Sequence, residues 1–185
     1  MAVNLKKGNS VNLTKEQPTL NKIMVGLGWD TSSLVMDLDA SAFMLERNGK
    51  VPNDNYFVFY NNLKSQDGAL QHTGDNRTGE GEGDDEMLLV NLSVINTNIS
   101  EIIFTVSIHD AKARGHHFGL VKNAFIRLYD IDNKTEILRY TLDEKFENYS
   151  EIEFGKLIKA DNNWSFTAMG NGSSKGLQGF VDIYI

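Results

Sequence analysis

The residues best suited to chemistry lie in one short segment, residues 72–86, which reads HTGDNRTGEGEGDDE. Six of the twelve positions from Asp75 to Glu86 are acidic, and Arg77 is the only base among them. Four glycines interrupt the segment and leave its backbone free to turn carbonyl oxygens in many directions. Such a density of oxygens on a pliable backbone makes the segment a candidate site for a hard divalent cation.

Two other loop chemistries do not fit this segment or its neighbours. Gly74 and Gly79 have the spacing of a phosphate-binding loop, but Glu80 follows where that loop needs a lysine to meet the phosphate charge. The EF-hand pattern is also missing, because neither the acids at Asp37 nor those at Asp130 are followed by the required glycine. A looser calcium site remains, since Ca²⁺ accepts about six to eight oxygens in flexible geometry, whereas Mg²⁺ requires a stiffer octahedron.

A second stretch, DLDAS, supplies further oxygens. Asp37, Asp39 and Ser41 alternate along a predicted strand and therefore share one of its faces. We expect this face to form the floor of a site that the acidic segment closes, with Asp67 as either a further ligand or a turn residue. A solvated acidic loop beside an exposed strand face is the open alternative. Within the segment the side-chain oxygens come from Asp75, Asn76, Glu80, Glu82, Asp84, Asp85 and Glu86.

The composition fits one domain spanning residues 1–185, with 41% hydrophobic residues to form a core. The net charge is −7, and residues 61–86 alone hold seven acids against Lys64 and Arg77, so the acidity is local. This balance excludes a broad basic surface for nucleic acid. The chain has no cysteine, which excludes disulfides, thiolate metal sites and thiol catalysis. No signal peptide or membrane span is visible in the sequence, which predicts a cytoplasmic protein.

Alternation with a period of two predicts an all-β fold. In residues 101–110, Ile102, Phe104, Val106 and Ile108 fall on one face of a strand. Paired strands are expected within 34–60, within 124–142 around a turn at 132–134, and within 150–170, and residues 176–185 are expected to add a final strand. Helix signals are weak, the best being one or two turns in 116–125. The pattern predicts an antiparallel β-sandwich with at most one or two short helices.

Five motifs occur in order along nearly the whole chain: LKKGNSVNLTK (5–15), VGLGWD (25–30), DLDASAFML (37–45), FYNNLKSQDGALQHTGDNRTGEGEGDDE (59–86) and FGLVKNAFIRLYD (118–130). Together they resemble the TerD family of tellurium-resistance and stress proteins. The resemblance implies a β-sandwich that binds two Ca²⁺ ions and a role in stress resistance without an agreed enzymatic activity. The ligand set that it implies is Asp37, Asp39, Asp67, Asp75, Asn76, Glu82, Asp84, Asp85 and Glu86.

The residues also indicate how such resistance arises. Reduction of tellurite by thiols needs cysteine, which the chain lacks, and the acidic segment repels an oxyanion. We therefore expect a calcium-dependent scaffold or sensor rather than an enzyme, acting with other proteins of a stress-response assembly, whether or not at a membrane. One alternative is a C2-like or lectin-like binder of membranes or glycans, in which Trp29 and Trp164 stack on sugars. Another is a hydrolase that uses paired carboxylates such as Asp84 and Asp85.

Overall fold

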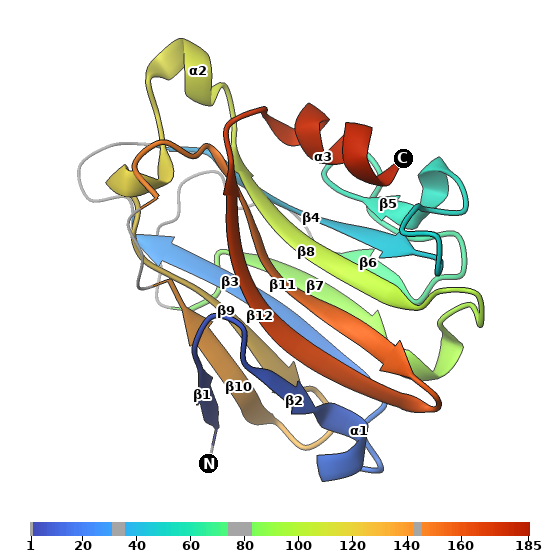
Figure 1. Ribbon diagram of the computed structural model, residues 1–185. Coiled ribbons are helices and arrows are strands. Elements are labelled where there is room, and N and C mark those ends of the chain that lie inside the picture. The colour runs from blue at the N-terminus through green and yellow to red at the C-terminus, as the bar shows by residue number, and fades with distance from the viewer. Residues whose placement is uncertain (1, 31–35, 74–82, 143–145) are drawn as a thin grey trace.

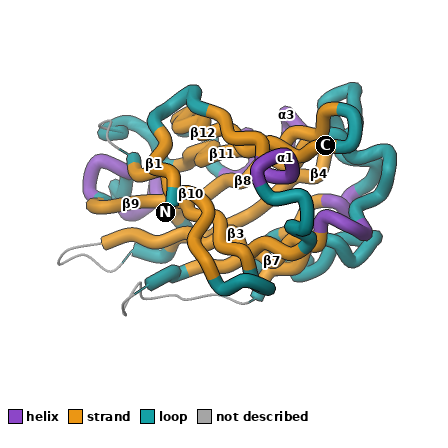
Figure 2. Tube along the Cα trace, turned by 90° about the horizontal axis from the view of Figure 1, so that it is seen from below, coloured by secondary structure: helices purple, strands orange, loops and turns teal. Residues whose placement is uncertain are grey.

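The protein is a sandwich of two sheets, as the sequence predicts. The computed structural model describes residues 2–30, 36–73, 83–142 and 146–185. In this part of the chain two six-stranded sheets pack face to face (Figure 1). Seen from below, the strands β12, β11 and β8 lie in one layer and the strands β10, β9, β3 and β7 in the other (Figure 2).

The first sheet is antiparallel except at one edge, where β1 pairs with β10 in parallel. Its strands β9 and β10 flank a turn at residues 131–134, which confirms the hairpin that the sequence predicts. In spatial order the sheet consists of β1 (Val3–Leu5), β10 (Thr135–Thr141), β9 (Lys122–Asp130), β3 (Lys22–Asp30), β7 (Glu86–Asn91) and β6 (Leu70–His72).

The second sheet is antiparallel throughout. The predicted pairing of β11 with β12 and that of β4 with β5 are both confirmed. In spatial order the sheet consists of β2 (Ser10–Asn12), β12 (Asn163–Ser173), β11 (Glu151–Ala160), β8 (Glu101–Ile108), β4 (Leu38–Leu45) and β5 (Phe57–Val58).

The alternating apolar residues of the strands form the core between the two sheets. All four predicted positions of β8, from Ile102 to Ile108, lie in this core. Trp29 and Trp164 are only 5% and 4% exposed, so they pack inside the sandwich and do not offer a face for stacking on a sugar.

Three short helices lie among the described residues, one more than the sequence predicts: α1 (Leu13–Glu16), α2 (Ala111–Arg114) and α3 (Leu177–Tyr184). Single 3-10 turns occur at Asp54–Tyr56, Leu92–Val94 and Phe118–Leu120, the last within the stretch where one or two helical turns are expected. None of the helices in the described part of the chain is long and apolar enough to cross a membrane.

The prediction of a final strand over residues 176–185 is wrong, because this stretch contains helix α3. Leu177, Phe180, Val181 and Tyr184 recur at the spacing of one helix face and cover the outer side of the second sheet (Figure 1). They pack there on a second apolar cluster made by Phe43, Leu45, Phe57 and Ile103.

The antiparallel pairing brings several strand ends together. Leu27, near the end of β3, lies opposite Glu86 at the start of β7, and Leu38 at the start of β4 lies opposite Ile108 at the end of β8. These strand ends meet at the left and upper side of Figure 1. We call this the acidic end, defined by Asp30, Asp37, Asp39, Asp84, Asp85 and Glu86.

The packing of α3 gives a first testable prediction. Phe180 is 3% exposed, so Phe180→Ala removes a large buried side chain and should lower the free energy of unfolding by about 3 kcal/mol in urea titrations. Ile183→Ala on the exposed side of the same helix is the control and should cost less than about 1 kcal/mol. Equal effects of the two changes would contradict the packing of α3 described above.

Candidate metal centre

The structure places five of the nine predicted ligands at the acidic end, on both sheets of the sandwich. Three consecutive residues come from the first residue of β7 and the two positions before it, and two come from the start of β4 and the position before it. The residues concerned are Asp84, Asp85 and Glu86 beside the first sheet, and Asp37 and Asp39 beside the second. Asp75, Asn76 and Glu82 lie outside the described residues.

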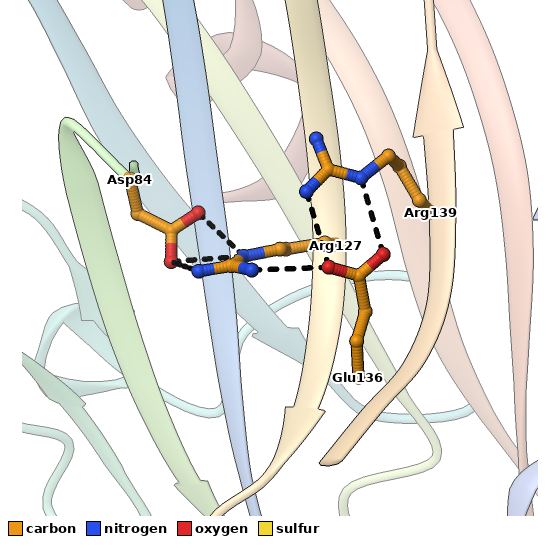
Figure 3. A network of polar contacts seen from close by, with 4 residues as sticks. All are labelled: Asp84, Arg127, Glu136 and Arg139. Atoms are coloured by element: carbon orange, nitrogen blue, oxygen red, sulfur yellow. Dashed lines mark hydrogen bonds and ion pairs between the residues drawn. The ribbon is translucent and has the colours of Figure 1, made fainter. Parts of the chain in front are cut away.

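Asp84 is held by an arginine from a strand that is not its neighbour in sequence. The guanidinium of Arg127 on β9 donates through Nε to Oδ1 of Asp84 at 2.8 Å and through Nη2 to Oδ2 at 2.8 Å (Figure 3). The Asp84 side chain is only 3% exposed, so this two-point pair largely replaces its water. The same guanidinium donates to Glu136 at 3.0 Å, and Arg139 binds Glu136 from the other side (Figure 3).

The glycines of VGLGWD explain how Asp84 reaches Arg127. A Cβ on Gly26 would lie 2.3 Å from Cγ of Asp84, so only glycine lets the carboxylate cross β3 at this point. A Cβ on Gly28 would meet the ring of Phe125 at 2.4 Å. Hydrogen bonding to Asp84 raises the pKa of Arg127 above its usual value, and hydrogen bonding to Arg139 lowers that of Glu136. The ion pair of Asp84 with Arg127 therefore attaches the chain just before β7 to strand β9.

Asp85 lies where negative charges crowd together. Its Oδ2 accepts the backbone N–H of Trp29 at 2.8 Å, and its own N–H donates to the carbonyl of Leu27 at 2.8 Å, so β3 fixes its position. Burial raises the pKa of Asp85 most, the hydrogen bond from Trp29 lowers it by a smaller amount, and the charges of Asp30, Asp84 and Glu86 each raise it further. An added cation would favour the ionised form of this carboxylate.

Glu86 faces the interior between the sheets. Its Oε2 lies 2.9 Å from Nε2 of His72, the last residue of β6, and both side chains are almost completely buried. Because His72 and Glu86 flank residues 73–85, their contact joins the two ends of that stretch. Glu86 already has a neighbouring ring nitrogen, which makes it a support of the site more than an open ligand.

The second sheet contributes two carboxylates in different environments. Asp37 directly precedes β4, and its Oδ1 is buried without a hydrogen-bond partner among the described residues. Asp39 lies on the outer face of β4 with 14% of its side chain exposed, and its Oδ2 is 3.8 Å from Nδ1 of His109. The predicted sharing of a strand face holds for Asp39 and Ser41, since Asp37 lies just outside the strand.

Asp67 is not brought together with the other candidates. It precedes β6 and lies beside the far end of β7, where its neighbour Ala69 accepts the N–H of Asn91. Oδ1 of Asp67 accepts from Ser65 at 2.7 Å and from the N–H of Ala69, and Oδ2 accepts the N–H of Asn96 at 2.9 Å. These bonds describe a carboxylate that holds a loop together.

The described residues fit a cation site in chemistry but do not complete one. No three acidic or histidine side chains converge on a common point within residues 2–30, 36–73, 83–142 and 146–185. The donor set is nevertheless all oxygen, and the buried Oδ1 of Asp37 lacks a donor there. The role of Arg127 was not predicted from the sequence, because nothing in the local pattern shows which carboxylate lies opposite a strand arginine. It also left out Asp30, which VGLGWD contains and which acts on Asp85.

Comparison with known proteins identifies relatives of the whole chain. Residues 1–184 match the family described as TerD domain. The chain is 50% identical to tellurium resistance protein TerD of Serratia marcescens, over 96% of this chain and 94% of that protein, and 45% identical to general stress protein 16U of Bacillus subtilis (strain 168), with the same coverage. The crystal structure of a homologue of telluride resistance protein from Streptomyces coelicolor A3(2) superposes with a TM-score of 0.68 at 23% identity, covering 87% of this chain and 95% of that one.

The ion pair between Asp84 and Arg127 gives a prediction that can be tested without a bound cation. Arg127→Met should lower the free energy of unfolding in excess chelator by roughly 2–4 kcal/mol, because it leaves a nearly buried carboxylate unpaired. The control is Arg114→Met, which loses only an exposed contact of 3.9 Å with Asp110 and should cost about 0.5 kcal/mol or less. Chemical denaturation measures both, and a loss for Arg127→Met as small as that of the control would show that the pair does not anchor the chain.

Proposed function

We propose, since this chain belongs to the TerD domain family, that it is a calcium-binding stress-response protein that acts as a scaffold or sensor rather than as a catalyst. Relatives are named for tellurium resistance and for general stress, which supports the stress-response part of the proposal. The acidic end supports the calcium part. We place the protein in the cytoplasm, with other proteins of a stress-response assembly as its partners.

The observation that carries the calcium proposal is the Oδ1 atom of Asp37. A buried carboxylate oxygen without a donor loses its hydration with no compensation, which is costly unless a cation lies beside it. The crowding around Asp85 has the same physical meaning, because four carboxylates at one strand end repel each other when all are ionised. A divalent ion supplies the positive charge that turns this repulsion into attraction.

The residues of the acidic end are proposed to have two roles: some bind the ion, and others contribute charge from fixed positions. Asp37, Asp39 and Asp85 are the described carboxylates proposed to bind the ion. Asp84 and Glu86 contribute charge from positions that Arg127 and His72 fix. Asp75, Asn76 and Glu82, which lie outside the described residues, are proposed to complete the coordination, and the family resemblance suggests two ions. Asp67 is left out, because its oxygens serve a loop at the other end of β7.

A non-catalytic role agrees with the chemistry of these side chains. Acid–base pairs need one carboxyl group in an apolar setting and another in a polar one, with an open position for substrate. Here Asp84 is tied to an arginine and Asp85 to a backbone N–H, so neither faces such a position. The chain also has no cysteine for the reduction of tellurite. Steady tellurite reduction by the purified protein would contradict the proposal.

The calcium proposal predicts that one substitution has opposite effects on stability without and with calcium. In excess chelator, Asp85→Asn should be at least as stable as the wild type near neutral pH, because it removes a charge that burial disfavours and neighbouring carboxylates repel, while an oxygen remains for the N–H of Trp29. The raised pKa means that the folded chain holds the proton longer, so without cation the wild type loses stability as pH rises from the unfolded pKa of Asp85 through the folded one. Calcium should reverse the order of the two proteins.

Thermal unfolding and calorimetric titration measure this reversal. Wild type should gain about 2.7 kcal/mol when free Ca²⁺ exceeds the dissociation constant a hundredfold, and Asp85→Asn should lose most of that gain. The control is Asp161→Asn in the turn between β11 and β12, where φ of +54° suits asparagine, and it should keep the full gain. An unchanged wild-type melting temperature in millimolar calcium would contradict the proposal.

A substitution of Asp67 tests whether this residue is a structural carboxylate or a calcium ligand. Asp67→Ala removes the acceptor of three hydrogen bonds and should lower stability in chelator by about 2 kcal/mol. Its gain on adding calcium should equal that of the wild type, because it lies away from the acidic end. If the calorimetric titration of Asp67→Ala instead loses a bound ion, Asp67 is a ligand after all.

A further inference from the structure

The outer face of the first sheet carries a small apolar hollow at the end away from the proposed calcium centre. It has a volume of about 250 Å³, and apolar parts of its wall come from Ala69, Leu89 and Ile131. Lys22, the first residue of β3, and Asn91, the last residue of β7, also line it, which places it at the opposite end of these strands from the acidic end. We call it the far hollow.

No helix covers this face of the sandwich in the described part of the chain. Helix α3 packs on the outer side of the second sheet, and Figure 2 shows none of the three helices on the outer side of β9, β3 and β7. Met24 on β3 pairs with Tyr129 on β9 and with Leu89 on β7. These three side chains alternate with core positions and are half-buried, so they extend the apolar surface from the far hollow across three strands.

The size of the far hollow suits one large side chain better than a whole small molecule. Ligand pockets usually have volumes of about 300–1,000 Å³ and enclose most of their ligand. A hollow of about 250 Å³ on an open sheet face accepts a single aromatic or branched side chain, as interface pockets accept an anchor residue.

The mouth of the far hollow is positively charged, although the chain as a whole has a net charge of −7. Lys22 lines it, and Lys64 lies beside it, because a Cβ on the lining residue Gly68 would be 3.3 Å from Cε and 3.9 Å from Nζ of Lys64. Both lysines are exposed, and neither forms an ion pair with any residue that the structure describes.

No acidic side chain within the described ranges lines the far hollow. Asp67 and Asp130 lie near it in sequence, but their carboxylates accept hydrogen bonds from the turns and loops around them. Asp132, in the turn after Ile131, is exposed and is not part of the wall. A negatively charged partner would therefore meet two lysines that are free to pair with it.

We propose that the far hollow docks an acidic segment of a partner protein, with one aromatic or large aliphatic side chain in the hollow and flanking carboxylates at Lys22 and Lys64. The apolar wall holds the anchor side chain, and the lysines select its neighbours by charge. The inference rests on the scaffold part of the proposed function, since a scaffold needs a surface for its partner, and it does not depend on calcium.

The test is a nuclear magnetic resonance titration of the full chain with the peptide acetyl-DEFED-amide, done once in calcium and once in chelator. Backbone signals of residues 68–71, 89–91 and 131 should shift in both conditions, because the far hollow lies away from the calcium centre. Acetyl-DEAED-amide, which lacks the anchor, and acetyl-KRFRK-amide, which has the opposite charge, should not bind; binding of either as tight as that of acetyl-DEFED-amide overturns the assigned chemistry. Absence of shifts with acetyl-DEFED-amide overturns this proposal and leaves the calcium proposal untouched.

Two lysine variants test the charges at the mouth. Lys22→Gln and Lys64→Gln should each weaken the binding of acetyl-DEFED-amide about threefold, which is the effect expected of an exposed ion pair. Lys15→Gln on α1 is the control and should leave the affinity unchanged. Equal affinities of the two variants and the control would overturn the role of the lysines.

A change in the wall tests the anchor pocket. Leu89→Ala should weaken the same peptide about fivefold while the spectrum shows an intact fold. Val94→Ala, in the 3-10 turn after β7 and 49% exposed, is the control and should bind as the wild type does. Unchanged affinity in Leu89→Ala would contradict the pocket. In sedimentation experiments, a concentration-dependent dimer that acetyl-DEFED-amide dissociates would overturn the partner protein in favour of a second copy of this chain.

Discussion

Negative charge gathers at one end of the sandwich, where each buried carboxylate needs compensation. Carboxylates that are taken out of water need a partner, and the partners here differ from residue to residue. Asp84 has an arginine, Glu86 has a histidine ring, and Asp37 has an oxygen without a donor in the described part of the chain. The first two contacts are built into the fold. The third is the one that an ion from solution would satisfy.

The strands, more than the loops, set the positions of these groups. Backbone bonds from Asp85 to Leu27 and from Thr73 to Met87 fix both ends of the acidic stretch in the first sheet, at 2.8 and 3.1 Å. The Asp84–Arg127 pair adds a side-chain attachment on the outer face of the same sheet. Carboxylates held on rigid strands lose little freedom when a cation arrives, and such preorganisation favours tight binding.

The sequence predicted the parts of the fold that depend on local pattern. The hairpins β9–β10 and β11–β12 are strongly alternating and close on short turns, so their pairing follows from neighbouring residues. The strand prediction for the last ten residues was wrong because their pattern fits two structures. Leu177, Phe180, Val181 and Tyr184 have the spacing of a helix face, while Phe180, Asp182 and Tyr184 also alternate as in a strand. Only the apolar surface around Phe43 decides between the two, and that surface comes from distant strands.

The same distinction applies to the site. The two clusters of acidic residues in DLDAS and GEGEGDDE could be recognised from the sequence, because each cluster is one continuous stretch of the chain. The pairing of Asp84 with Arg127 could not, because it depends on the register of β3 between β7 and β9 and on the absence of a side chain at Gly26. Asp67 was grouped with the ligands by its nearness in sequence, whereas the antiparallel pairing of β6 with β7 places it beside the far end of β7.

The outer face of the second sheet changes from apolar to polar along its strands, and helix α3 covers only part of it. Phe43 and Ile103 form an apolar row under α3, Thr105 and Glu153 belong to the next polar row, and Ser107 and Glu151 to the one after. Tyr184 of α3 donates its hydroxyl to Glu153, and burial and this bond raise the pKa of the tyrosine, so the helix covers the first polar row. The second polar row extends past the helix. Helix packing therefore accounts for the apolar row and for Glu153, whereas Glu151 is held by the Ser150 hydroxyl and by the backbone N–H of Lys175, just before the helix begins.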